Sequence, residues 1–414
     1  MTRFLRRHGK NKRMVNNIHD EVITMAHGSG GASSAELMQR VFSKHFHNEI
    51  LGRLEDSAVV DLAADRSGDG AGVDSTTVRA EVGAGAGTAR SDGRLAISTD
   101  TFVVTPLVFP GGDIGKLAVC GTVNDVLMSG ATPRWLTCGF ILETGLSIEF
   151  LDCICVSLAK TAAEAGVTII AGDTKVIEGR GEGGESNGEG GGLMINTTGI
   201  GVFEGDADIS PAPSGIRLGD AIIVSGNLGD HHAAILSARM GIQNNIQSDC
   251  ALLTPIVKAM READIGIHAM RDVTRGGLAT VLNELAEASG VSIELEENSI
   301  PVSREVKAFC GIMGLDPLYM GNEGKVIIAV APEDAVRALA AIQETEIGKN
   351  AAIIGSALQR DGALALQRDG IIASPLMAGN SVLSAASSVV YMKTRVGGTV
   401  RLDVLYGEGL PRIC

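Results

Sequence analysis

The stretch Met270-Arg271-Asp272-Val273-Thr274-Arg275-Gly276-Gly277 decides how this chain is expected to fold. Behind it, apolar residues recur at the spacing of one helix face: Leu278, Val281, Leu282, Leu285 and Ala286. Gly290 then ends the predicted helix. Free amides at a helix start, one aspartate and two arginines therefore come together, which is what a magnesium-bound polyphosphate requires.

Further segments of the second half follow similar patterns. The apolar run 221–225 leads into a glycine loop, 226–229, and then into Asp230, two histidines and a helix that reaches Met240. Strand, glycine loop and helix is the usual order of a phosphate cradle. Asn322-Glu323-Gly324-Lys325 stands directly before the apolar strand 326–330. The adjacent histidines would face different ways on a helix, so we interpret them as structural.

The first half offers a glycine loop, Gly28-Ser29-Gly30-Gly31, and two helices. A helix from Gly115 carries Asn124-Asp125 beside its apolar stripe, and a second spans 150–164. The apolar run 167–171 follows and reads as a strand. Gly172-Asp173-Thr174-Lys175 would then lie at its carboxyl end, where α/β proteins usually place their chemistry.

Length and composition favour an α/β protein of two domains. The chain has 414 residues, of which 45% are hydrophobic, 3% are aromatic and 54 are glycine, so we expect an aliphatic core and glycine-rich loops. The low-complexity segments 61–93 and 178–192 read as insertions. The expected organisation is a disordered leader (1–24), an N-terminal ATP-binding and dimerisation domain (25–210), a C-terminal α/β domain (211–402) and a mobile tail (403–414). Residues 371–400 follow no clear periodicity.

Charge and cysteine content restrict the partners and the compartment. A formal net charge of -14 disfavours nucleic acid as a partner but leaves room for a small anion brought in with Mg²⁺. The seven cysteines include no CxxC pair, so reduced thiols in the cytoplasm are the simplest account. The basic start has no apolar segment behind it and is no secretory signal. Uninterrupted apolar runs are too short to span a membrane.

Several aspartates stand beside glycines or at the edge of apolar elements: Asp56, Asp100, Asp125, Asp173 and Asp272. For any one of them a turn or cap residue is the commoner explanation. Together with two glycine loops in an acidic chain, they favour Mg-nucleotide binding. The chain contains neither a GxxxxGK[ST] motif nor the protein-kinase signatures, so another nucleotide site is expected.

The chain ends in Gly407-Glu408-Gly409-Leu410-Pro411-Arg412-Ile413-Cys414. A terminal thiol on a segment broken by glycine and proline is suited to delivering a group to another site. Taken alone, an incidental cysteine on a frayed end explains it as well.

At this point a set of motifs resembles a known family. The motifs are Gly28-Ser29-Gly30-Gly31, Phe109-Pro110-Gly111-Gly112, Cys120-Gly121-Thr122-Val123-Asn124-Asp125, Gly172-Asp173-Thr174-Lys175, Arg271 to Gly277, Asn322-Glu323-Gly324-Lys325 and Pro411-Arg412-Ile413-Cys414. Their joint occurrence resembles HypE, the carbamoyl dehydratases of hydrogenase maturation. HypE belongs to the superfamily of aminoimidazole ribonucleotide synthetase. The basic leader, both insertions and residues 371–400 depart from the family pattern.

The resemblance implies a two-domain homodimer of the aminoimidazole ribonucleotide synthetase fold and a specific reaction. HypF would load a carbamoyl group onto Cys414, ATP would drive its dehydration to a thiocyanate, and the HypC and HypD complex would receive the cyanide for the iron of [NiFe] hydrogenase. The catalytic residues would be Cys414, Lys175 and Glu323, and the magnesium ligands Asp56, Asp100, Asp125 and Asp272. The ATP site would comprise Gly28, Ser29, Gly30, Gly31, Asn124, Asp173, Asp230, Thr274, Gly276 and Gly277.

Alternatives remain open from the residues alone. A small-molecule kinase or synthetase of the same superfamily would leave Cys414 incidental, and a thiol carrier would bind nucleotide only as a switch. Lys175 follows the apolar run 167–171 and Glu323 precedes the apolar strand 326–330, and their opposite charges are expected to keep each other ionised. A structural salt bridge between them is the alternative explanation.

Overall fold

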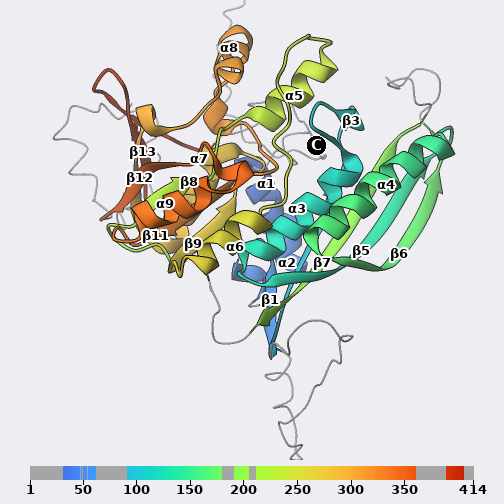
Figure 1. Cartoon of the computed structure of the whole chain (residues 1–414), viewed down its shortest axis with the longest axis horizontal. Helices are drawn as coiled ribbons and strands as arrows, with labels where there is room; N and C mark the ends of the chain where they lie inside the picture. The colour runs from blue at the N-terminus through green and yellow to red at the C-terminus, as the bar shows by residue number, and fades with distance from the viewer. Residues whose placement is uncertain are drawn as a thin grey trace, which may run out of the picture.

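The structure is a computed structural model that describes residues 31–46, 48, 50–53, 55–61, 91–179, 191–204, 211–359 and 388–404. The predicted leader, Gly28, Ser29, Gly30, most of both predicted insertions, and Cys414 with the tail from 405 lie outside the described residues. Two sheets with their helices form a mixed α/β molecule (Figure 1). The predicted α/β class is therefore confirmed.

The first sheet is built by the N-terminal half. Its strands, in spatial order, are β1 (Ala58–Asp61), β2 (Ser91–Phe102), β7 (Leu193–Glu204), β5 (Thr132–Glu143) and β6 (Thr168–Ile177). Helices α3 (Ile114–Met128) and α4 (Ile148–Ala165) cover one face (Figure 1). Alternate residues of β7, such as Ile195 and Phe203, are buried, whereas Asn196 between them is exposed. The sheet therefore has one packed and one open face.

Helix α3 begins and packs for identifiable local reasons. Asp113 caps it, and its Oδ1 accepts hydrogen bonds from the amides of Gly115 (2.8 Å) and Lys116 (2.9 Å). Gly201 of β7 lets the helix lie close to the sheet, because a Cβ there would lie 2.4 Å from Cγ1 of Val126. This close approach places the polar residues of α3 near the ends of the strands.

The second sheet is built by the C-terminal half. Its strands, in spatial order, are β14 (Thr399–Arg401), β13 (Val390–Lys393), β10 (Ser292–Glu296), β12 (Ala352–Leu358), β8 (Ala221–Val224), β11 (Val326–Val330) and β9 (Ile267–Asp272). Helix α7 (Gly277–Ser289) packs on one face, and α6 (Thr254–Glu262) with α9 (Ala335–Gln343) on the other. Helices α5 (Asp230–Arg239) and α8 (Arg304–Met313) extend from one end (Figure 1).

Shorter elements complete the described chain. They are α1 (Ala32–Leu37), a π-helix (Met38–Phe42), α2 (Ser43–Phe46), the β3–β4 hairpin (Val108–Phe109 and Gly112–Asp113) and 3-10 turns at Leu51–Arg53, Glu297–Ser299, Pro317–Tyr319 and Glu346–Gly348.

One hydrophobic core continues from the first half into the second. Buried Ile114 and Leu117 of α3 belong to the same apolar cluster as Ile256 and Val257 of α6 and Ile328 of β11. Residues that the sequence assigns to separate domains therefore share a core. The shared core fixes α3 against the second sheet, and α3 contacts β9.

Two sequence expectations are corrected by the strands. Strand β6 runs on to Ile177, so Gly172 to Lys175 lie within it rather than beyond its carboxyl end. Residues 390–393 and 399–401, in the stretch without periodicity, form β13 and β14 at one edge of the second sheet. These strands have only four and three residues, which is too few for a periodicity to be recognised in the sequence.

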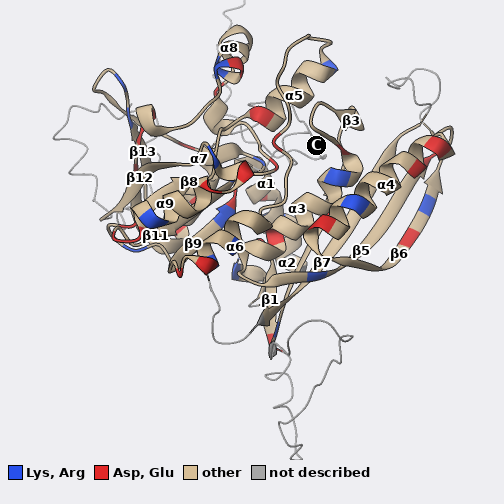
Figure 2. Cartoon of the chain, viewed as in Figure 1, with Lys and Arg blue, Asp and Glu red and all other residues tan. Residues whose placement is uncertain are grey.

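In the part of the chain that the structure describes, no helix combines the length and the apolar character needed to cross a membrane. Acidic and basic residues are interspersed over both halves (Figure 2).

Candidate nucleotide and magnesium site

Four predicted metal ligands from distant parts of the sequence come together between the two sheets. Asp56 precedes β1, Asp100 lies in β2, Asp125 in α3, and Asp272 ends β9. Burial raises the pKa of Asp125 well above its ordinary value, and the charges of Asp272, Asp100 and Asp56 raise it further. Burial and the neighbouring Asp56 likewise raise the pKa of Asp272. The four carboxylates therefore form one electrostatic cluster.

Hydroxyl groups orient two of these carboxylates. Ser98 donates to Oδ2 of Asp125 at 2.8 Å, and Thr122 donates to Oδ2 of Asp100 at 3.3 Å. Ser98 of β2 thus orients the carboxylate of α3, and Thr122 of α3 orients the carboxylate of β2.

Arg271 links the aspartate cluster to the second sheet, a role that the sequence did not single out. Its Nε lies 2.8 Å from Oδ1 of Asp56, and its Nη2 lies 3.2 Å from Oε2 of Glu284. Burial raises the pKa of Asp56 to about 6 even though Arg271 opposes the rise. The guanidinium of Arg271 thus offsets part of the negative charge of the aspartate cluster. The negative charge that is left favours binding of a further cation.

The donor set fits magnesium. Among the described residues, no three His, Cys, Asp or Glu side chains form a ready-made metal cage. Mg²⁺ is usually held by one or two carboxylates together with substrate phosphates and water, so a complete protein cage is not needed. Buried carboxylates that raise one another's pKa are suited to a hard cation that brings phosphate oxygens with it.

The glycines after β9 allow the backbone to turn tightly into α7. Gly276 and Gly277 have φ values of 78° and 65°, in the left-handed region. A Cβ on Gly277 would lie 2.5 Å from the carbonyl carbon of Tyr319. The amide of Gly277 donates to the carbonyl of Thr274 at 3.1 Å. Since no side chain caps α7, the turn presents its first helical amides close to Asp272.

A second buried group of charges surrounds the start of α5. Lys325 Nζ lies 2.9 Å from Oδ2 of Asp249, and both side chains are buried. Burial and the charge of Asp249 raise the pKa of Asp230 to about 6, and Ser303 donates to Asp230 at 3.3 Å. Asp249 is a site residue that sequence reasoning missed, because it lies in a segment without helix or strand.

Glu323 is buried next to the aspartate cluster. Burial raises its pKa well above the ordinary value, with further increases from Cys250, Asp272 and Asp249. A Cβ on Gly121 of α3 would lie 4.0 Å from Glu323 Oε2, so the carboxyl group faces this helix. Glu323 thus bridges the region between α3 and the second sheet.

The expected pairing of Glu323 with Lys175 is wrong for a single chain. Lys175 lies on the exposed strand β6, where its Nζ is 2.5 Å from Oδ2 of Asp173. Its charge is therefore matched within β6, and the surroundings of Glu323 favour the protonated carboxyl group. Lys175 lies in β6 of the first sheet, whereas Glu323 precedes β11 of the second sheet.

Asn124, a predicted ATP-site residue, joins two parts of the chain through its side chain. Its side chain is buried, its Nδ2 donates to the carbonyl of Ala251 at 3.0 Å, and its Oδ1 accepts from the amide of Leu253 at 2.8 Å. These bonds join α3 to the segment that carries Asp249. Gly31, the described member of the first glycine loop, is buried and precedes α1.

Magnesium should stabilise the protein more at neutral than at acidic pH. The pKa of Asp56 rises from 3.8 to about 6 in the folded chain, so its contribution to stability is complete below 3.8 and is lost as the pH rises through about 6. At a pH where the carboxylates are ionised, bound Mg²⁺ neutralises their charge and restores this stability. Calorimetry with and without Mg²⁺ should show a larger rise in Tm at about pH 7.5 than at about pH 5.

Asp125→Asn should remove most of this difference between the two pH values and weaken the binding of Mg-ATP. Asp334→Asn, a change in an exposed ion pair with Arg337, is the matched control and should behave as wild type. An equal rise in Tm at both pH values would contradict a magnesium role for the cluster.

The fold and the aspartate cluster define the class of protein. The chain matches the family model of AIR synthase related proteins, with the N-terminal domain over residues 81–203 and the C-terminal domain over residues 217–366. The predicted two-domain fold of this class is thereby confirmed.

The comparisons also identify the family within that class. "Carbamoyl dehydratase HypE" of Escherichia coli strain K12 is 42% identical over 395 residues, which are 95% of this chain and 99% of the relative. A crystal structure of "Hydrogenase Maturation Protein HypE in complex with ATP" is 41% identical, with a TM-score of 0.66 over 95% of this chain and 100% of that chain. A "HypE-HypF complex" is 36% identical, with a TM-score of 0.69 over 89% of this chain and 99% of that chain. This chain belongs to the HypE family of carbamoyl dehydratases.

Proposed function

We propose that this chain uses ATP to dehydrate a carbamoyl group carried on Cys414, producing a thiocyanate that supplies cyanide to the iron of [NiFe] hydrogenase. The observation that supports this most directly is the cluster of four aspartates, of which Asp272 is buried and the other three are partly buried, beside buried Glu323 in a chain of the HypE family. A small-molecule kinase is not favoured, since the relatives that match nearly the whole chain are carbamoyl dehydratases.

The chemistry requires activation of oxygen and removal of protons from nitrogen. An amide oxygen leaves poorly, and transfer of the γ-phosphoryl group to it makes phosphate the leaving group. The S–C bond to Cys414 is kept, the C–O bond breaks and two N–H protons depart, which leaves the nitrile. Mg²⁺ held by Asp56, Asp100, Asp125 and Asp272 would neutralise the phosphate charge.

Glu323 is the proposed acceptor of a carbamoyl proton. A carboxylate whose pKa is raised by burial is a stronger base than an exposed one once it has lost its own proton. Arg275 opposes that rise and favours the ionised form. Thr274, Gly276 and Gly277 would face the phosphates at the start of α7, and Asp230 would face the nucleotide from α5.

The first glycine loop and Asp173 are further proposed members of the ATP site. Gly28, Ser29 and Gly30 are proposed to contact ATP as the family resemblance implies, with Gly31 next to them at the start of α1. Asp173 stays a proposed member of the ATP site, although it pairs with Lys175 on β6.

The partners follow from the same family. The solved HypE-HypF complex supports HypF as the protein that loads Cys414. We propose the HypC and HypD complex as the acceptor of the cyanide and the cytoplasm as the compartment, both as expected from the sequence.

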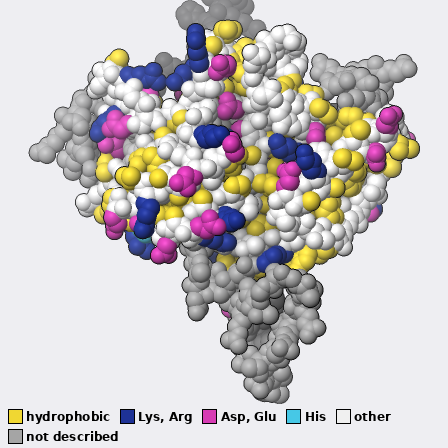
Figure 3. All heavy atoms as spheres, viewed as in Figure 1, with side chains coloured by type: hydrophobic (Ala, Val, Ile, Leu, Met, Phe, Trp, Pro, Cys, Tyr) yellow, Lys and Arg dark blue, Asp and Glu magenta, His cyan; other side chains and the backbone are white. Residues whose placement is uncertain are grey.

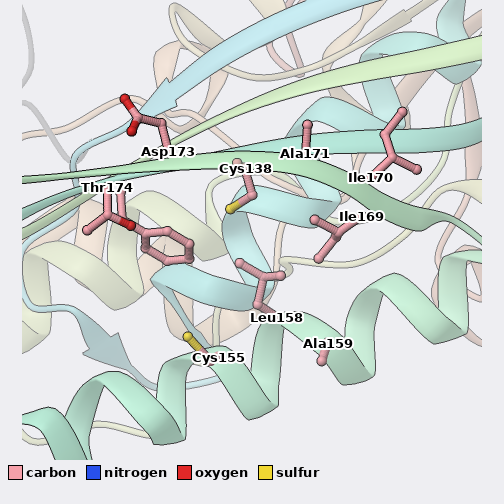
Figure 4. A pocket seen from close by; sticks show the side chains of 11 residues that line it. Cys138, Cys155, Leu158, Ala159, Ile169, Ile170, Ala171, Asp173 and Thr174 are labelled. Carbon is pink, nitrogen blue, oxygen red and sulfur yellow. The ribbon is translucent and has the colours of Figure 1, made fainter.

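We further propose a homodimer formed through the first sheet. Strand β6 is an edge strand with every residue exposed, and hydrophobic side chains gather over this end of the molecule (Figure 3). Ile169 points toward Leu158 of α4, in a hollow also lined by Cys138 and Cys155, whereas Ile170 points to the opposite side (Figure 4). Lys175 lies on the same strand, so it would act where two copies meet.

Ile170→Asp should convert a dimer to a monomer, because it places a charge among exposed apolar residues of β6. Val336→Asp, on α9 and also exposed, is the control and should leave the dimer intact. Light scattering after gel filtration gives both masses. A monomeric wild-type chain, or a dimeric Ile170→Asp variant, would contradict this interface.

The function itself is tested by mass spectrometry of the C-terminal peptide. The full chain is incubated with HypF, carbamoyl phosphate and ATP. Cys414 should first carry a carbamoyl group, and this group should then lose one water to become a thiocyanate. A carbamoyl adduct that persists in the presence of Mg-ATP, or a peptide that is never modified, would overturn the proposal.

A further inference from the structure

Asp249 contacts both Glu323 and Lys325, and we propose that it is a positioning residue that holds Glu323 against the carbamoyl group during dehydration. The inference rests on the proposed function, in which Glu323 is the proton acceptor. It adds a residue that touches neither ATP nor substrate and acts through Glu323.

The contacts of Asp249 fix the backbone of Glu323. Its Oδ1 accepts the amide of Glu323 at 3.1 Å, and its Oδ2 accepts Lys325 Nζ at 2.9 Å. The carbonyl of Glu323 accepts the amide of Ala251 at 3.2 Å. Both backbone polar groups of Glu323 are therefore held by one short segment, 249–251.

Close packing leaves this segment little room to move. A Cβ on Gly324 would lie 2.0 Å from the carbonyl oxygen of Asp249. On the other side of Glu323, buried Asn322 accepts the amide of Gly229 at 2.8 Å and donates to the carbonyl of Val273 at 3.0 Å. With its backbone held on both sides, Glu323 retains freedom mainly in its side chain.

The negative charge of Asp249 strengthens this arrangement. Burial alone would raise its pKa, but Lys325, His231 and the Glu323 amide together hold the pKa below its ordinary value. Hydrogen bonds to an ionised acceptor are stronger than those to a neutral one. The Nζ of Lys325, 2.9 Å from Oδ2 of Asp249, offsets the negative charge that Asp249 brings into this buried region.

The first test compares single turnover in two variants that lose similar buried contacts. Asp249→Ala should slow the conversion of preloaded carbamoyl-Cys414 by about tenfold or more, since small displacements of a reacting group have large effects on rate. Its affinity for Mg-ATP should stay near that of wild type. Asp220→Ala is the matched control, because Asp220 is also buried and accepts from the amide of Arg217 and pairs with His268, each at 2.8 Å. It should lose stability but convert at the wild-type rate.

The second test asks whether Asp249 acts through Glu323. If it does, Asp249→Ala combined with Glu323→Gln should be no slower than Glu323→Gln alone, whereas independent residues would give multiplied losses. Asp249→Asn keeps an oxygen acceptor and should recover part of the rate, and it replaces Asp249→Ala if that variant does not fold. Multiplied losses, or a wild-type rate in both Asp249 variants, would overturn the positioning role. A wild-type rate in Glu323→Gln would instead remove the proposed role of Glu323 itself.

Discussion

Cys414→Ala should abolish thiocyanate formation while leaving Mg-ATP binding intact. In the proposed reaction the carbamoyl group is attached to the sulfur of Cys414, so no other residue can replace it. The aspartate cluster lies on or next to β1, β2, α3 and β9, and α7 packs in a hydrophobic core of described residues, so we expect Mg-ATP binding to survive loss of the thiol. The variant is examined by mass spectrometry after incubation with HypF, carbamoyl phosphate and ATP, and by calorimetry with Mg-ATP.

Cys153→Ala is the matched control, because Cys153 is an exposed cysteine on α4. It should be loaded and converted as in wild type. A cyanated Cys414→Ala protein would show that the group is carried elsewhere, and an unfolded one would show that the tail contributes to the core.

Glu323→Gln should be loaded by HypF at the normal rate and then convert its carbamoyl group about 10² to 10⁴ times more slowly, the usual range for loss of a general base. Glutamine has nearly the same shape and lacks the proton-accepting carboxylate. The folded chain already favours a protonated Glu323, so little stability should be lost. Rapid-quench single turnover with ATP should show accumulated carbamoyl-Cys414.

Glu143→Gln is the control for this change. Glu143 is a partly buried glutamate of the first sheet whose Oε2 accepts the amide of Gly192 at 3.0 Å. It should react as wild type. Normal conversion in Glu323→Gln, with Lys175→Ala slow, would move the proton transfer to Lys175.

The local elements were predictable because their signals come from neighbours in the chain. The apolar periodicity after Gly277 and the stop at Gly290 predicted α7, and Gly166 ended α4. Strands β13 and β14 were missed because they are short, with four and three residues, which is too few to establish a periodicity.

The candidate site was predictable only as a set of residue types. Asp56, Asp100, Asp125 and Asp272 each resemble an ordinary turn or cap residue in the sequence. Their number favoured Mg-nucleotide binding, and the motif resemblance selected these four as the magnesium ligands. The fold brings them together because β1, β2, α3 and the end of β9 meet along the shared core. Lys175 and Glu323 were grouped in the same way, yet they lie on different sheets.

The sequence by itself determined the two-domain α/β class, the helix after Asp272 and the family, since periodicity and motifs depend on the order of residues. The tertiary structure alone decided that Asn124 joins α3 to the segment 251–253, that Asp249 holds Glu323, and that Glu323 favours its protonated form. Burial and Coulomb interactions depend on distance through space, and the local sequence around a residue does not show which distant residues will lie next to it.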